Sequence, residues 1–296
     1  MLRYCVSLLV AATVFAAEPA DWVITGRYVV TMNPRREVIE DGAVAVNGTA
    51  IAAVRKRAEI DRRFDARKRL NRPDALIAPG LINTHTHAAM SLFRGIADDL
   101  RLQDWLEKYI FPAEAKNVSS EFVRWGTKLA CLEMMLSGTT TFADMYYFEE
   151  AAAEATVECG LRGVLGQTII GFPSPDAKTP AAALKRAEAF LRRYRNDSLI
   201  VPAIAPHALY TNSGATLKAS RELANRYGVP LLIHLSETRT ENEESRVKHG
   251  ATPTQVLNRL GVFNGRTVAA HCVWLDEQDR RLLKERNAGI AHCASS

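Results

Sequence analysis

From residue 75 onward, short apolar runs alternate with longer amphipathic stretches, and this alternation restricts the chain to few folds. Short apolar runs bounded by turn signals are typical of strands buried on both faces, and apolar residues at helical spacing are typical of helices. We predict strands at 76–83, 139–145, 163–170, 200–205, 230–235, 267–273 and 289–293, and helices at 120–136, 148–159, 181–194, 215–227 and 253–260. Buried strands separated by helices indicate a parallel sheet with right-handed crossovers.

Seven predicted strands are one fewer than a closed (β/α)8 barrel needs, and the sequence ends just after the seventh. A doubly wound open sheet also accepts seven strands. No Gly-x-Gly-x-x-Gly turn follows the first strand, which disfavours a dinucleotide-binding fold. Gly160, Gly228 and Gly261 follow three of the predicted helices, where a C-terminal glycine is expected.

The first residues have the form of a secretory signal. Arg3 precedes an apolar run at 6–17, and small residues allow cleavage after Ala16 or Ala17. We therefore predict a signal peptide at 1–17 and an exported protein, periplasmic or secreted; the alternative is a buried N-terminal strand or helix. Spanning a bilayer takes about 20 apolar residues, so no stable membrane anchor is expected.

Residues 18–75 are predicted to form a small β part. Runs rich in β-branched residues cover 22–31 and 42–54, and Asn47-Gly48 is a strong hairpin signal because both residues tolerate positive φ. The stretch 55–72 is rich in Arg and Lys but is broken by acidic residues, and the formal net charge is only +5. A solvated surface is the favoured interpretation, and no nucleic-acid partner is expected.

Five of the seven histidines lie in or just after the last residues of predicted strands: His85, His87, His207, His234 and His271. In a barrel, the carboxyl ends of the strands form the face that carries the active site. Two histidines separated by one residue on a strand point to the same side, and imidazole is a favoured ligand of zinc, with nickel, copper and iron as competitors. His234 is the natural third ligand beside His85 and His87, because the fifth strand faces the first across a closed barrel.

Glu237 follows His234 by three residues and could relay a proton from water to a ring nitrogen or leaving amine. The alternative is a carboxylate that favours a helix start. His271 either steadies the attacking water or is a hydrogen-bonded core residue. His292 is either a pocket wall or a packing residue, and His249 is expected on the surface.

Four cysteines follow the predicted signal: Cys131, Cys159, Cys272 and Cys293. No pair has Cys-x-x-Cys spacing, so buried free thiols are expected rather than a disulfide framework. A bridge between Cys272 and Cys293 would require their strands to be neighbours.

Six segments together resemble the amidohydrolase superfamily: PGLINTHTH, SLFRGIADDLRLQDWLEKYIFPAE, GTTTFADMY, PHALYT, HLSET and AAHCVWLD. The most similar members are the methylthioadenosine/S-adenosylhomocysteine deaminases and the related chlorotriazine hydrolases and guanine deaminases. The resemblance implies an α/β fold, a TIM-like (β/α)8 metal-dependent hydrolase barrel at 76–296, with a β-sandwich built from both chain ends. It assigns His85, His87 and His234 to one zinc ion, Glu237 to the proton shuttle and His271 to the water.

The resemblance also assigns Glu114 and His207 to substrate binding and Trp105 to an aromatic wall. Without it, Trp105 and Glu114 would be interpreted as parts of an ordinary amphipathic helix. Two departures stand out. Family members have a final Asp ligand on an eighth strand, and the sequence ends at Ser296 before it, so we expect a truncated chain with an incomplete metal site. Gln167 stands where nucleoside-processing members have a substrate-binding Arg, which disfavours S-adenosylhomocysteine.

The sequence thus predicts a metal-dependent hydrolase that deaminates a small amino-substituted N-heterocycle of purine, pterin or triazine type. The expected cofactor is one Zn²⁺ per chain, with Fe²⁺ or Ni²⁺ as alternatives, and a homo-oligomer stays open. A related C–Cl or cyclic-amide hydrolase is the rival enzyme, although Glu237 favours deamination. An inactive remnant or a binding module that has lost catalysis is the rival from outside the enzyme class.

Overall fold

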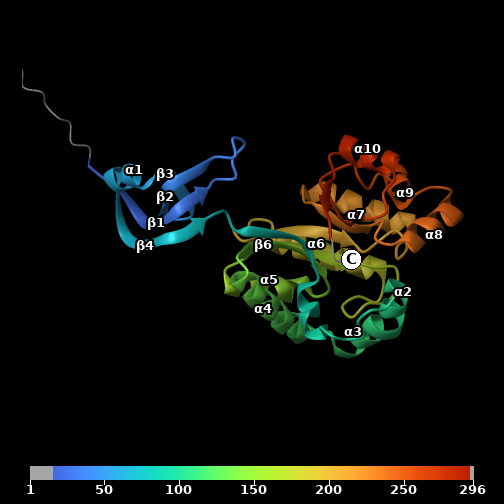
Figure 1. Ribbon diagram of the computed structural model, residues 1–296. Helices are drawn as coiled ribbons and strands as arrows, with labels where there is room; N and C mark the ends of the chain where they lie inside the picture. The colour runs from blue at the N-terminus through green and yellow to red at the C-terminus, as the bar shows by residue number, and fades with distance from the viewer. Residues whose placement is uncertain (1–15, 294–296) are drawn as a thin grey trace, which may run out of the picture. The chain divides into compact units, whose positions relative to one another are not determined.

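The computed structural model describes residues 16–293 and divides the chain into two compact units, with the boundary between Pro79 and Gly80. Figure 1 shows the first unit in blue to cyan and the second from cyan to red. Residues 1–15 of the predicted signal peptide lie outside the described residues. No helix of the described part has both the length and the apolar character needed to cross a membrane.

The first unit is a four-stranded sheet with one short helix. Its elements are β1 (Glu18–Val30), β2 (Val38–Asn47), β3 (Ala50–Lys56), α1 (Arg57–Arg63) and β4 (Phe64–Ile77), in the strand order β3-β2-β1-β4. The predicted hairpin is confirmed: β2 and β3 are antiparallel, Asn47 faces Ala50, and Gly48 has a φ of 57°. Ile60 of α1 and Phe64 of β4 are buried with Val23 in the core of this unit.

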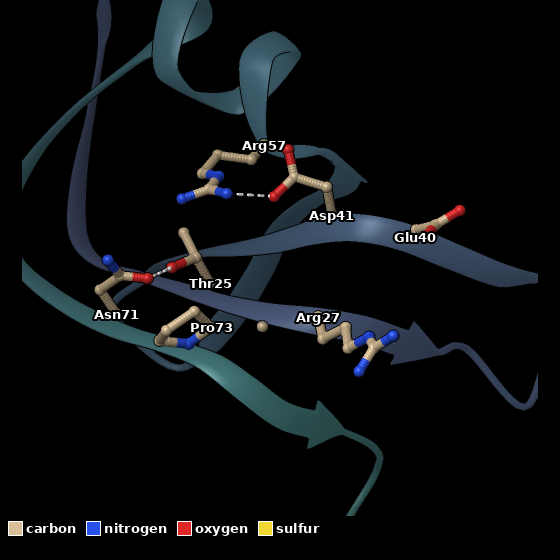
Figure 2. A pocket seen from close by; sticks show the side chains of 8 residues that line it. Thr25, Arg27, Glu40, Asp41, Arg57, Asn71 and Pro73 are labelled. Atoms are coloured by element: carbon tan, nitrogen blue, oxygen red, sulfur yellow. Dashed lines mark hydrogen bonds and ion pairs between the residues drawn. The ribbon is translucent and has the colours of Figure 1, made fainter.

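The Arg- and Lys-rich stretch 55–72 covers α1 and much of β4. Nearly all residues of β4 are at least partly exposed, which confirms the predicted solvated surface. Two polar side chains of this stretch form contacts with other elements of the first unit (Figure 2). Arg57 of α1 forms an ion pair with Asp41 of β2, and Asn71 of β4 accepts a hydrogen bond from the Thr25 hydroxyl over 2.7 Å. These contacts tie β1 to β4 and α1 to the sheet.

The second unit contains a seven-stranded, wholly parallel sheet whose strand order follows the sequence. Its strands are β5 (Leu81–Thr86), β6 (Thr139–Tyr146), β7 (Arg162–Ile169), β8 (Ile200–Pro206), β9 (Leu231–Leu235), β10 (Thr267–His271) and β11 (Gly289–Ala291). All seven predicted strands are present. The first was placed too early, because Leu76 and Ile77 belong to β4 and the new strand starts at Leu81.

The sheet curls until its first and sixth strands approach one another. The ring centroids of His85 on β5 and His271 on β10 are 5.0 Å apart, although four strands separate β5 from β10 in the sheet. A flat sheet with about 4.8 Å between strands would hold these residues more than 20 Å apart. The predicted TIM-like barrel is therefore confirmed as a nearly closed parallel barrel of seven described strands.

Helices surround this sheet (Figure 1). Five were predicted: α4 (Ser120–Leu136), α5 (Glu149–Cys159), α6 (Pro180–Tyr194), α7 (Gly214–Tyr227) and α9 (Pro253–Arg259). Six further elements were not: η1 (Ala88–Phe93), α2 (Leu102–Trp105), η2 (Leu106–Ile110), α3 (Phe111–Asn117), α8 (Arg239–His249) and α10 (Glu277–Glu285). Gly160, Gly228 and Gly261 have φ values of 73°, 66° and 78°, and this left-handed backbone after a helix is the reason for glycine there.

Candidate metal centre and active site

Three histidines converge at the carboxyl ends of β5 and β9. His85 lies in β5, His87 directly follows it, and His234 is the fourth residue of β9. One ring nitrogen of each lies within 4.8 Å of the other two, a cluster that could hold a metal ion. Parallel strands bring their carboxyl ends to one face of a barrel, so residues far apart in sequence meet there.

Two of these rings are held in a single orientation by backbone carbonyls. His87 Nδ1 lies 2.6 Å from the Met145 carbonyl oxygen, and His234 Nδ1 lies 2.8 Å from the His207 carbonyl oxygen. A carbonyl only accepts, so each Nδ1 carries the hydrogen and each Nε2 keeps its lone pair. The two Nε2 atoms lie 3.2 Å apart. Two lone pairs that face each other at this distance repel, and a cation between them removes the repulsion, so the residues fit a bound metal ion.

Burial keeps these imidazoles neutral. It lowers the pKa of His85 to about 2, with the neighbouring His87 as the second cause. Burial also lowers the pKa of His87, and it lowers that of His234 well below the ordinary value. A metal ligand must be unprotonated, so the site can bind a cation at neutral pH without first releasing protons.

Glu237, the predicted proton shuttle, and His271, the residue predicted to steady the water, lie next to this cluster. Glu237 Oε1 is 3.5 Å from His271 Nε2. Burial raises the pKa of Glu237 to about 7, and the charge of Glu241 adds to the effect. Burial lowers the pKa of His271 to about 4, so at neutral pH His271 is uncharged and the two groups form a polar contact. A carboxyl group that titrates near pH 7 can both take up and release a proton.

Glu241, which the sequence analysis missed, holds the turn that carries Glu237. Its two carboxylate oxygens accept from the backbone N–H of Ser236 over 3.2 Å and of Glu237 over 2.8 Å. Ser236 has a φ of 48°, in the left-handed region where a side chain is strained. Thr238 caps α8 by accepting from the Glu241 N–H, so Thr-x-x-Glu is the pattern of a capping box and could have pointed to Glu241.

A pocket beside the histidines is lined by all three residues that the resemblance assigned to substrate binding, namely Trp105, Glu114 and His207, together with His87. The remaining lining is apolar or aromatic apart from Thr168: Met90, Leu106, Ile110, Phe111, Met145, Tyr146 and Tyr147. A concave, mostly apolar site with a few polar groups is the usual form of a small-molecule site.

The polar residues of this pocket are fixed by hydrogen bonds. The Tyr146 hydroxyl donates to Glu114 Oε1 over 2.7 Å, while burial raises the pKa of Glu114 to about 7. Trp105 Nε1 donates to the Ile96 carbonyl oxygen over 3.2 Å, which orients the indole. Burial lowers the pKa of His207 to about 3, so this ring is neutral. Tyr146 is a second residue that the sequence analysis missed, because only the fold brings it to Glu114.

The other sequence-predicted residues lie around or away from the pocket. His249 is exposed at the end of α8, as predicted, and His292 Nδ1 contacts the His271 carbonyl oxygen over 3.2 Å. Gln167 is fully buried, donates to Asp176 over 2.8 Å and is not among the residues that line the pocket. That Gln167 in place of an Arg disfavours S-adenosylhomocysteine stays a prediction.

All four described cysteines are free, as predicted, but only Cys131 is fully buried. Cys272 and Cys293 remain unbridged although β10 and β11 are neighbours. Cys293 belongs to a second group of potential metal ligands, together with His85 and His271, whose ligand atoms lie within 4.8 Å of one another. This second group could not be predicted from the sequence, because nothing in the spacing of its residues indicates that they meet.

Comparisons with known proteins agree with this geometry. Residues 76–296 match the model of the amidohydrolase family. A 5-methylthioadenosine/S-adenosylhomocysteine deaminase of Thermodesulfovibrio yellowstonii is 47% identical over 93% of this chain and 63% of its own length. The corresponding deaminase 1 of Syntrophus aciditrophicus is 48% identical over 88% of this chain and 59% of its own length. The chain thus spans about three fifths of these relatives.

Solved structures are also similar to this chain. An adenosine deaminase from Xanthomonas campestris with bound zinc has a TM-score of 0.91 and 40% identity, over 94% of this chain and 63% of its own. A guanine deaminase from C. acetobutylicum, at 22% identity and a TM-score of 0.81 over 92% of this chain and 67% of its own, shares the fold. The family match covers the whole barrel and its histidine cluster, and the chain belongs to the amidohydrolase family.

Proposed function

We propose that this protein is a zinc-dependent hydrolase that deaminates an amino-substituted N-heterocycle, with adenine nucleosides as the first class to test. The observation that carries the proposal is the pair of Nε2 lone pairs of His87 and His234, 3.2 Å apart, with Glu237 and His271 beside them. The names of the relatives and the zinc in the Xanthomonas campestris structure support it.

His85, His87 and His234 would hold the zinc ion. When bound, zinc supplies Lewis-acid chemistry that makes water a nucleophile near neutral pH. Glu237 takes a proton from the attacking water and delivers it to the ring nitrogen or to the leaving amine, which its pKa of about 7 allows in both directions. Neutral His271 lies 3.5 Å from Glu237 and would steady the attacking water.

The pocket beside this centre would bind the heterocycle. Trp105 offers a flat apolar surface, and Glu114 offers a carboxyl group fixed by the Tyr146 hydroxyl. His207 offers a neutral ring that can donate or accept. An aromatic wall with a few oriented polar groups suits a flat heterocycle that carries hydrogen-bonding atoms at its edge.

The direct test is ammonia release by the zinc-loaded chain from 5′-methylthioadenosine, S-adenosylhomocysteine, adenosine and guanine, with a chlorotriazine as the rival substrate. Glu237→Gln cannot relay the proton, and we expect it to lower kcat/KM by about 10²–10⁴-fold. Glu244→Gln is the matched control, because Glu244 is an exposed carboxylate on the adjacent α8.

The proposal is supported if the parent chain and Glu244→Gln release ammonia from an adenine compound and Glu237→Gln does not. Chloride release without ammonia would support the rival halide hydrolysis instead. A folded chain with zinc bound that turns over none of these compounds would contradict the proposed deamination.

We also propose that the protein is exported, on the strength of Arg3 and the apolar run at 6–17. Mass spectrometry of the protein from a bacterial periplasm tests this. A mature N-terminus at Ala17 or Glu18 agrees with export, whereas an intact Met1 in a cytoplasmic fraction contradicts it.

A further inference from the structure

A second group of potential metal ligands lies at the same end of the barrel and includes a thiol. His85, His271 and Cys293 each offer one ligand atom, and these atoms lie within 4.8 Å of one another. They come from β5, β10 and the residues just after β11, so three strand ends converge on this point. Cys293 and His85 are partly buried, and His271 is 6% exposed.

The donor set selects a particular class of ion. One thiolate and two imidazoles suit borderline and soft divalent cations and disfavour Mg²⁺ and Ca²⁺, which prefer oxygen ligands. In a tetrahedral site with Zn–N bonds of about 2.0 Å and Zn–S bonds of about 2.3 Å, ligand atoms lie about 3.3–3.7 Å apart. Atoms that are within 4.8 Å of one another reach this geometry after side-chain movements of roughly 1 Å.

We propose that His85, His271 and Cys293 form an alternative, thiolate-containing site for a soft divalent cation such as Cd²⁺ or excess Zn²⁺. The Cys293 thiol releases its proton to the solvent as the metal–sulfur bond forms, so no oxidant or reductant takes part. This site shares His85 with the three-histidine centre but adds two other ligands, so it goes beyond the proposed function.

The two sites compete because they share His85. A neutral imidazole has one lone pair, since its other nitrogen carries the hydrogen, so His85 serves one ion at a time. A cation at the thiolate site takes His85 away from His87 and His234. It also occupies His271, whose ring lies 3.5 Å from Glu237. Thiophilic cations therefore displace the ion of the three-histidine centre and inhibit the protein.

The test is a titration of the metal-free full chain with Cd²⁺, observed by the ultraviolet charge-transfer absorption of cadmium–thiolate bonds. All chains tested, the parent included, carry Cys5→Ser, Cys131→Ala and Cys159→Ser. The first change removes the thiol of the predicted signal peptide. The other two thiols lie close together on α4 and α5 and could bind Cd²⁺ themselves. Cys272→Ser is the matched control for Cys293→Ser, since Cys272 is a free thiol on the neighbouring strand end.

We expect the absorption to saturate at about one Cd²⁺ per chain, to vanish in Cys293→Ser and to persist in Cys272→Ser. It should also persist in His234→Ala, which lacks a ligand of the three-histidine centre only. On a zinc-loaded chain, Cd²⁺ should release zinc stoichiometrically unless Cys293 is replaced. The proposal is overturned if the absorption survives in Cys293→Ser. It is also overturned if neither the parent chain nor His234→Ala shows the absorption. None of these measurements depends on catalytic activity.

Discussion

Replacing Glu241 by Ala tests whether one buried carboxylate holds the turn beneath the proposed catalytic residue. Glu241 is 7% exposed and accepts from the N–H groups of Ser236 and Glu237. The alanine variant leaves both amides without their acceptor. A buried polar group that loses its partner costs about 1–3 kcal/mol. Ser236 is completely buried, so water cannot reach its N–H group. Glu237 is partly exposed, so water can partly replace the hydrogen bond that its N–H group loses.

We therefore expect Glu241→Ala to lower the free energy of unfolding by about 2–4 kcal/mol. This is the full cost of an unpaired Ser236 N–H group and part of the cost for Glu237. For a domain of this size, 1 kcal/mol corresponds to roughly 2–4 °C in Tm, so the expected loss is roughly 5–15 °C. The left-handed Ser236 then loses its main restraint, and kcat/KM should fall by at least about tenfold as Glu237 leaves its position.

The assay is thermal unfolding followed by circular dichroism, with kcat/KM measured on the same samples. Glu244→Ala is the control, because this exposed residue lies on the same helix and outside the turn. If Glu241→Ala and Glu244→Ala unfold within about 1 °C of each other, the two amides are satisfied in another way and the reasoning about the turn is wrong.

Two further predictions concern packing and pH. Gly126→Ala should lower the free energy of unfolding in urea by about 1–3 kcal/mol, because the added Cβ would meet the Ala89 backbone oxygen at 2.4 Å. This steric clash outweighs the roughly 1 kcal/mol by which alanine is favoured over glycine in a helix. A variant that is more stable than the parent chain would contradict this prediction. Glu237 must be ionised to accept a proton, and its pKa is raised to about 7. We therefore expect kcat/KM to fall as the pH drops below about 7. A pH profile of kcat/KM that stays flat down to pH 5 would exclude Glu237 as the base.

Most of the barrel could be predicted from the sequence because its inner strands, β6 to β10, are largely buried. Such strands are apolar throughout and contrast with the polar loops and amphipathic helices around them. The histidines at strand ends were equally informative, since the carboxyl ends of parallel strands must meet. This shared face, the alternation of side chains along a strand and the family resemblance all placed His85, His87 and His234 together, and the structure brings them together.

The first barrel strand was predicted in the wrong place because β4 does not look like a strand. It carries charged residues over most of its length, and nearly all of them are exposed. Without a hydrophobic alternation, only the apolar end at Leu76 and Ile77 was recognised, and it was joined to the next strand across Pro79 and Gly80. Strand pairing with β1, which the local sequence does not encode, decides this segment.

The residues around the pocket were the least predictable from local pattern. Trp105 and Glu114 lie in short helical turns, and only the family resemblance singled them out. The bond between Glu114 and Tyr146 and the cluster that contains Cys293 both join segments far apart in the sequence. Such contacts depend on the tertiary structure, and the spacing of residues within one segment does not predict them.

The metal content of the purified chain tests whether His85, His87 and His234 form a metal centre. Elemental analysis of the folded protein, with circular dichroism on the same sample, should give about one zinc per chain. His87→Ala and His234→Ala should each lose the zinc while Cys293→Ser keeps it, because only the first two replace ligands of this centre. A folded chain that holds no metal, or that holds equal zinc after either histidine is replaced, would contradict the account.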